Sequence, residues 1–187
     1  MTDNFFGDGL VFEDSLPLTW TPGPLPQGAE LARLNADNQQ LLGAVASLEQ
    51  SRVYEPLKDE SSAVMQELQR LELKLDILLR LTAEISMRHA ALPPPRRLRL
   101  AARGLEWLDC GPGEASGTGV LQLYVNPAVP QALKLPSRVA GEGLIAGVPS
   151  TRFEYHGVGE AVVELIDKFI FRHHRRSIAG AKNPGAM

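Results

Sequence analysis

Hydrophobic residues recur at alternating spacings of three and four in two stretches of the chain, residues 29–50 and 62–89. The first repeat consists of Leu31, Leu34, Asn38, Leu41, Val45 and Leu48, and the second of Val64, Leu68, Leu71, Leu75, Leu78, Thr82 and Ile85. A sustained period of 3.5 residues is typical of a helix whose narrow apolar seam packs against a partner helix rather than on a sheet. The pattern therefore predicts two long helices within a helical, coiled-coil oligomerisation region over 28–90.

Two arrangements of these helices remain open. In one, they form a hairpin within a single chain, joined by residues 51–61. In the other, the second helix pairs with copies of itself. Leucines at heptad position a, with Val64 and Ile85 among the d positions, favour more than two strands. Further apolar residues flank this seam, so we expect a four-helix bundle and a homotetramer.

Asn38 occupies an a position of the first helix and also leaves two interpretations open. It pairs with its symmetry mate and fixes the register of a bundle, or it is an exposed polar residue on a hairpin.

Short β-like runs surround the helical region. Residues 9–20 (GLVFEDSLPLTW) read as a strand, in which Pro17 indicates an edge position or a bulge. Further strands are expected at 97–109, 119–126, 131–141 and 145–156, followed by a last helix over about 158–176. Within 97–109 leucines alternate with arginines, and the apolar parity changes after Gly104, which predicts a bend or bulge there. The arginine face either binds phosphates or carboxylates or is an ordinary solvated surface.

Composition narrows the class of protein. The chain has 187 residues, 44% hydrophobic and 22% charged, which is typical of a globular domain. Its formal net charge of -3 gives no overall attraction to nucleic acid, so we expect no nucleic-acid partner. The single cysteine, Cys110, cannot form an internal disulfide, and no signal peptide or membrane span is recognisable. We therefore expect a cytoplasmic protein.

No catalytic constellation is recognisable in the sequence, so we expect no enzyme and no catalytic residue. Sequence motifs for phosphate loops, nucleophile elbows and zinc proteases are missing. His173 and His174 are adjacent, which on a helix directs them about 100° apart, so we expect no metal site there.

The carboxy-terminal half resembles PilZ domains. The segment 166–179 (IDKFIFRHHRRSIA) is similar to the closing helix of that family, 133–140 (LKLPSRVA) to a preceding strand, and 151–155 (TRFEY) to its late strand. The resemblance implies an α+β fold, a six-stranded antiparallel β-barrel with a C-terminal helix. The barrel domain would comprise 9–20 and 97–179, the two heptad-repeat helices would be inserted after the first strand, and 180–187 would be a disordered tail.

The resemblance also implies a role in bacterial cyclic di-GMP signalling, in motility, adhesion or virulence, with protein partners from signalling or pilus machinery. PilZ domains bind cyclic di-GMP through R-x-x-x-R and [D/N]-x-S-x-x-G motifs. When Gly104 is set on the motif's last glycine, Arg99 replaces the Asp or Asn and Ala101 replaces the Ser. The candidate residues of a degenerate ligand site are Arg96, Arg97, Arg99, Arg103 and Gly104.

Loss of the motif's acidic and hydroxyl groups removes buried hydrogen-bond partners of a nucleotide, at about 1–3 kcal/mol each. We therefore expect no cofactor and no cyclic di-GMP binding in the usual mode, and an oligomeric adaptor is the favoured function. The alternative is a cyclic di-GMP receptor with a divergent arginine site.

Overall fold

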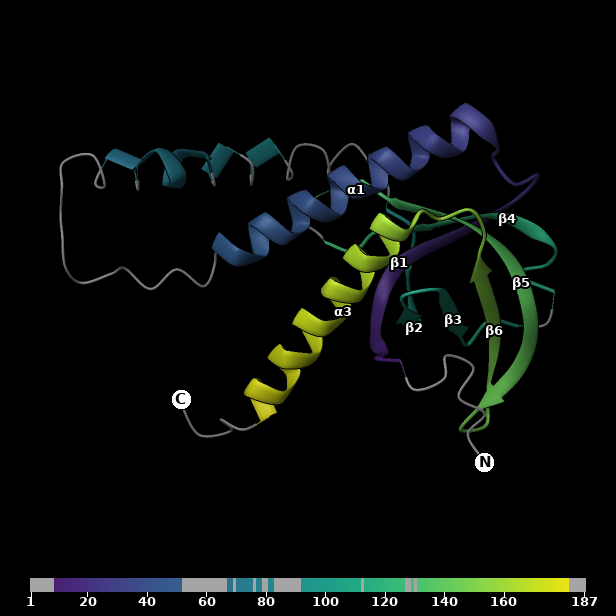
Figure 1. Cartoon of the computed structure of the whole chain (residues 1–187). Coiled ribbons are helices and arrows are strands. Elements are labelled where there is room, and N and C mark those ends of the chain that lie inside the picture. Colours follow the sequence, from purple (N-terminus) through teal and green to yellow (C-terminus); the bar gives the residue numbers. More distant parts are fainter. Residues whose placement is uncertain are drawn as a thin grey trace.

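The structure is a computed structural model that describes residues 9–51, 67, 68, 70–75, 77, 78, 81, 82, 92–111, 113–126, 129 and 131–181. At its centre lies a closed antiparallel barrel with the strand order β1-β2-β3-β6-β5-β4 (Figure 1). The strands are β1 (Phe12–Pro22), β2 (Pro95–Ala101), β3 (Gly104–Leu108), β4 (Thr118–Leu123), β5 (Leu133–Ile145) and β6 (Val148–Tyr155). The expected six-stranded antiparallel barrel is therefore confirmed.

Strand β1 pairs with two neighbouring strands, and its pairing changes from one to the other after Pro17. Residues Phe12–Pro17 pair with β2, and Leu18–Pro22 pair with β4. The ring of Pro17 removes one donor from the ladder, while its carbonyl accepts a hydrogen bond from the Tyr124 amide at 3.0 Å. A strand that closes a barrel in this way tolerates proline at the point where its pairing changes.

The run 97–109 is a hairpin and not one bent strand. Ala102 and Arg103 form a two-residue turn, and Leu98 and Leu100 then pair with Trp107 and Leu105 across β2 and β3. All four of these side chains are buried. The change of parity at Gly104 thus reflects a chain reversal, which places both apolar sets inside the barrel.

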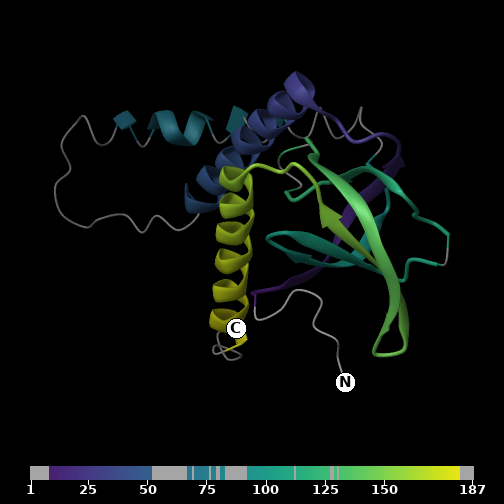
Figure 2. The same ribbon diagram turned by 45° about the vertical axis from the view of Figure 1, so that its right-hand side comes forward.

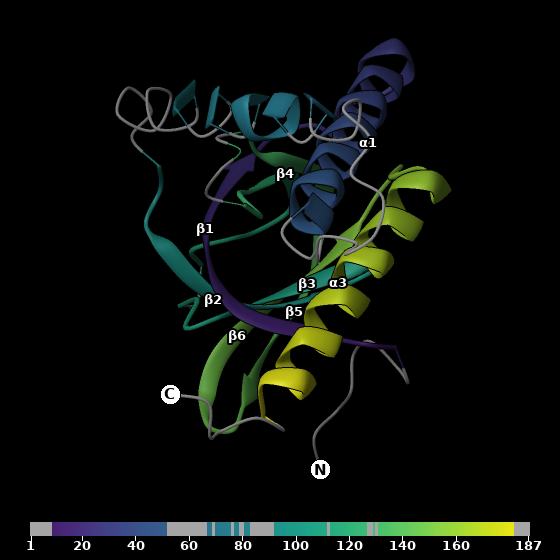
Figure 3. The same ribbon diagram turned by 90° about the vertical axis from the view of Figure 1, so that its left-hand side faces the viewer.

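Two helices pack on the barrel and on each other. The C-terminal helix α3 (Glu160–Ala181) packs on β1 and β2, and α1 (Gly28–Ser51) packs on α3 and β5. Figures 2 and 3 show both helices on one side of the barrel. The C-terminal helix continues through Ala181, so the tail predicted from residue 180 begins too early; residues 182–187 lie outside the described part of the chain.

The heptad seam of the first helix faces its own chain. Leu41 and Val45 are buried, and so is Leu42, which is not part of the repeat. Leu31 packs on the loop before α3, where a Cβ at Gly157 would lie 2.7 Å from Leu31 Cδ2. Together with its contact to β5, this makes the apolar face of α1 broader than a coiled-coil seam. Helix α1 thus packs on the barrel domain, while the inserted oligomerisation region over 28–90 stays a prediction.

Asn38 is neither a symmetry-paired nor an exposed residue. Its side chain is buried, its Nδ2 donates to the Lys134 carbonyl at 2.7 Å, and the Lys134 amide donates to its Oδ1 at 3.0 Å. Lys134 lies on the part of β5 that precedes its pairing with β6, which begins at Ser137. The Asn38 amide group therefore supplies the hydrogen bonds that a neighbouring strand would otherwise make.

We expect Asn38→Ala to lower the free energy of unfolding by about 2 kcal/mol, because it leaves a backbone donor and acceptor of β5 without their partner. Urea denaturation measures this effect. Gln39→Ala, one position along on the exposed face, is the matched control, with an expected change below about 0.5 kcal/mol. Equal effects of the two substitutions would contradict the role assigned to Asn38.

Candidate functional site

The candidate ligand residues lie on β2 and in the turn to β3. Arg99 donates from Nη1 to Glu106 Oε2 at 2.8 Å, and Arg152 donates from Nε to Glu106 Oε1 at 3.0 Å. These residues are direct cross-strand neighbours on β2, β3 and β6. The Glu106 side chain is 0% exposed. Arg99 stands at the family's Asp or Asn position, and its guanidinium is already paired with the buried carboxylate of Glu106.

Arg96 and Arg97 are consecutive on β2 and therefore point to opposite faces of the strand. The guanidinium of Arg96 lies over the Trp107 ring, 5.4 Å from its centroid. Arg97 lies 3.4 Å from Glu13 and 3.9 Å from Asp109, with all three side chains more than half exposed. The two arginines do not converge on one ligand position.

Arg103 lies in the β2–β3 turn and faces the first turn of α3. Its Nη2 donates to both carboxylate oxygens of Glu160, at 2.8 and 3.1 Å. Gly104 follows at the start of β3 and is buried, paired with Ala101 and Glu154. The structure therefore distributes the four candidate arginines over separate positions, three with carboxylate partners and one on an aromatic ring.

A cavity of about 650 Å³ opens beside this turn. Its walls come from the segment before β1, the β2–β3 turn, the end of β6 and one face of α3. Its lining residues are Gly9, Leu10, Ala101, Ala102, Arg103, Glu154, Tyr155, Gly157, Val158, Val163 and Asp167. Of the predicted ligand residues, only Arg103 reaches it.

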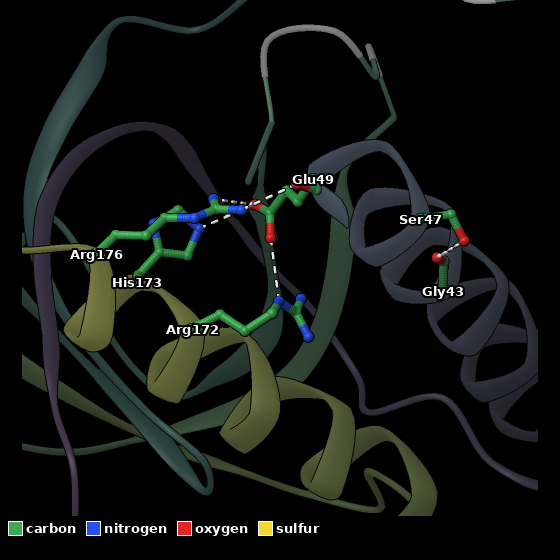
Figure 4. A network of polar contacts seen from close by, with 6 residues as sticks. All are labelled: Gly43, Ser47, Glu49, Arg172, His173 and Arg176. Carbon is green, nitrogen blue, oxygen red and sulfur yellow. Dashed lines mark hydrogen bonds and ion pairs between the residues drawn. The ribbon is translucent and has the colours of Figure 1, made fainter. Parts of the chain in front are cut away.

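A second polar cluster joins α1 to α3 and was not predicted from the sequence (Figure 4). Glu49, near the end of α1, accepts from Arg172 Nε at 3.1 Å, and its other oxygen lies 3.0 Å from His173 Nε2. Arg176 donates to the Glu49 carbonyl at 3.1 Å. Only 8% of the Glu49 side chain is exposed. We call these four residues the Glu49 cluster.

The charges of the Glu49 cluster favour an ionised carboxylate. Burial alone would raise the pKa of Glu49, but the hydrogen bonds and charges of His173 and Arg172 outweigh burial and hold the pKa below its ordinary value of 4.5. The ring of His173 also packs against Phe12 and Phe169, with centroid separations of 4.9 and 4.3 Å. The cluster therefore fixes α1 to α3 and, through Phe12, to β1.

The spacing of Glu49 from the buried residues of α1 is a sequence signal for this cluster. Glu49 follows Val45 by four residues and so continues the buried face of α1 with a carboxylate. Within the basic run 172–176 of α3, Arg172, His173 and Arg176 contact Glu49.

The second heptad repeat presents apolar side chains to solvent. Its described residues at 67, 68, 70–75, 77, 78, 81 and 82 are helical, and Val64 and Ile85 lie outside the described part. Leu68, Leu71, Leu75 and Leu78 are 48–59% exposed. The Thr82 hydroxyl donates to the Leu78 carbonyl at 2.8 Å.

The described residues contain neither a metal-binding cluster nor a membrane-spanning helix. Within those ranges, no group of three or more His, Cys, Asp or Glu side chains could hold a metal ion. No helix among them is long and apolar enough to cross a membrane.

Comparisons with known proteins agree with this architecture. A family model described as "Atypical PilZ domain, cyclic di-GMP receptor" matches residues 42–183. A solved structure from Xanthomonas campestris is 22% identical, with a TM-score of 0.73 and 93% of each chain covered. That structure is described as a pathogenic protein with a new tetrameric PilZ domain self-assembled via an unusual helical bundle. No curated protein matches the chain.

Proposed function

Because this chain belongs to the family of atypical PilZ domains, described as cyclic di-GMP receptors, we propose that it is a non-catalytic adaptor that assembles as a homotetramer. In this proposal the second heptad repeat forms the bundle, and the barrel contacts protein partners of bacterial signalling or pilus machinery, in motility, adhesion or virulence. Cyclic di-GMP does not bind in the usual mode.

The exposed leucines of the second repeat are the observation that supports assembly most directly. Four side chains of one seam are about half exposed in the single chain, and Leu81, which flanks the seam, is 48% exposed. An apolar surface of this extent on a helix favours burial against copies of itself. The helical-bundle tetramer described for the Xanthomonas campestris protein is a precedent within the same fold.

Light scattering on the purified chain tests the assembly. We expect a mass of about four times 20.4 kDa, independent of concentration in the micromolar range. A mass of one chain under these conditions would contradict the proposed tetramer.

The contacts of the candidate arginines support the second part of the proposal. A phosphate that approached Arg99 or Arg103 would have to replace a carboxylate that already pairs with it, Glu106 or Glu160. At Arg99, this exchange would remove one of the two guanidinium partners of the buried Glu106 carboxylate. The loss of an ion pair in a site shielded from water raises the free energy of the folded chain.

Isothermal titration with cyclic di-GMP tests this part, and we expect no binding in the micromolar range or tighter. The alternative function, a receptor with a divergent arginine site, predicts saturable heat that Arg103→Ala abolishes. Arg33→Ala, at an exposed position of α1, is the control and should leave such heat unchanged. Micromolar binding that depends on Arg103 would replace the adaptor proposal with the receptor.

A further inference from the structure

The cavity beside the β2–β3 turn has a mixed lining of apolar and charged side chains. Leu10, Ala101, Val158 and Val163 line it, and Leu10 is 39% exposed. Its volume of about 650 Å³ lies within the range of cavities that enclose a few side chains or a small ligand. A concave surface of this size that combines apolar side chains with a few charged groups is a candidate binding site.

Negative charges outnumber positive charges around the cavity. Arg103 pairs with Glu160 at 2.8 Å, and Glu154 pairs with Arg138 at 3.0 Å. Asp167 lines the cavity one helical turn after Val163, on the same face of α3. No hydrogen bond or ion pair of Asp167 occurs with any residue that the structure describes. After these pairings, one negative charge remains at the cavity.

This balance excludes an anion as the best occupant. A phosphate in the cavity would meet the carboxylates of Glu154 and Asp167, and the single guanidinium there, that of Arg103, already pairs with Glu160. A cation would pair with Asp167 without breaking an existing contact, and apolar neighbours would cover Val158 and Val163.

We propose that this cavity is the docking site for a segment of a partner protein that carries one lysine or arginine among apolar residues, with its cation paired to Asp167. The inference rests on the proposed adaptor function, which it deepens by stating the chemistry of the partner.

The wall of the cavity is held in place by α1. Asn35 Nδ2 donates to the Gly157 carbonyl at 3.0 Å, and the Gly159 amide donates to Asn35 Oδ1 at 3.0 Å. The same loop carries Val158, a lining residue. Because the loop is fixed by two hydrogen bonds from a helix of the same domain, the cavity is formed before a partner arrives, which lowers the entropic cost of docking.

Two pools of synthetic peptides test the proposal. Each peptide has seven residues with apolar residues varied at four flanking positions, and the central residue is Lys in one pool and Glu in the other. Both pools are passed over the immobilised full chain, and retained peptides are quantified by mass spectrometry. We expect about tenfold greater retention of the Lys pool, since attraction to Asp167 and repulsion of Glu act in the same direction.

Asp167→Asn should reduce this preference to about twofold or less, because it removes the carboxylate and leaves the apolar wall. Asp37→Asn, the same substitution at an exposed position of α1 outside the cavity, should leave the tenfold ratio unchanged. Equal retention of both pools, an equal loss in the two variants, or displacement of the peptides by cyclic di-GMP would each overturn the proposal. Light scattering on the same samples separates the outcomes, because a tetramer without lysine preference contradicts the docking site alone.

Discussion

Replacing Leu75 and Leu78 together by lysine is expected to convert the assembly into single chains of 20.4 kDa. Both side chains are more than half exposed in the single chain, so the substitution costs little there. In a four-helix bundle it would place eight unpaired ammonium groups in the seam, and burial of each would cost several kcal/mol. The loss should therefore be complete at micromolar concentrations, as measured by light scattering.

The control for this experiment uses the same helix and the same chemistry. Leu73 and Ile77 are exposed apolar residues that lie outside the heptad seam. Their joint replacement by lysine should leave the mass at about four times 20.4 kDa, since the new charges face solvent. A tetramer that survives Leu75→Lys with Leu78→Lys would show that the second repeat is not its core.

Glu49→Gln is expected to lower the free energy of unfolding by about 3 kcal/mol. The substitution keeps the shape of the side chain but leaves Arg172, His173 and Arg176 around a neutral amide in a buried position. Removing one partner of a buried ion pair typically costs 3–5 kcal/mol, because the remaining charge is no longer compensated. Urea denaturation at neutral pH measures the loss. Glu30→Gln, at an exposed position of the same helix, should change stability by less than about 0.5 kcal/mol.

The same cluster predicts the direction of a pH effect. Since the pKa of Glu49 is lower in the folded chain than its ordinary value of 4.5, the unfolded chain takes up a proton at this site first as the pH falls. The stabilisation by Glu49 is therefore fully present above about pH 4.5 and is lost as the pH decreases through the lower folded value. The difference in stability between wild type and Glu49→Gln should narrow over this acidic range. A difference that stays constant down to pH 3 would contradict the ionised cluster.

The barrel could be predicted from the sequence because its strands are short and bounded by Gly and Pro, and because their order resembles a known family. The β2–β3 hairpin was missed since its turn, Ala102-Arg103, lacks the Asn-Gly or Asp-Gly pair that marks tight hairpins. A bend and a reversal both change the parity of the apolar residues, so alternation alone cannot separate them.

The first heptad repeat does not by itself distinguish packing on the barrel from packing in a bundle, for a geometric reason. Periods of 3.5 and 3.6 residues diverge by only about 20° per heptad, so a helix of 24 residues fits both. Buried Leu42, beside the seam, is the residue that indicates a broader face. The Glu49 cluster joins residues 123–127 positions apart, and such pairs leave no local pattern in a sequence.

Helix α1 is tied to the domain along its whole length, by Asn35 and Asn38 in its first half and by Glu49 near its end. It is therefore fixed against the barrel as far as Glu49. A tetramer of such chains would carry four copies of the cavity, one on each barrel. A partner with repeated copies of one basic segment would then gain avidity by engaging more than one of them.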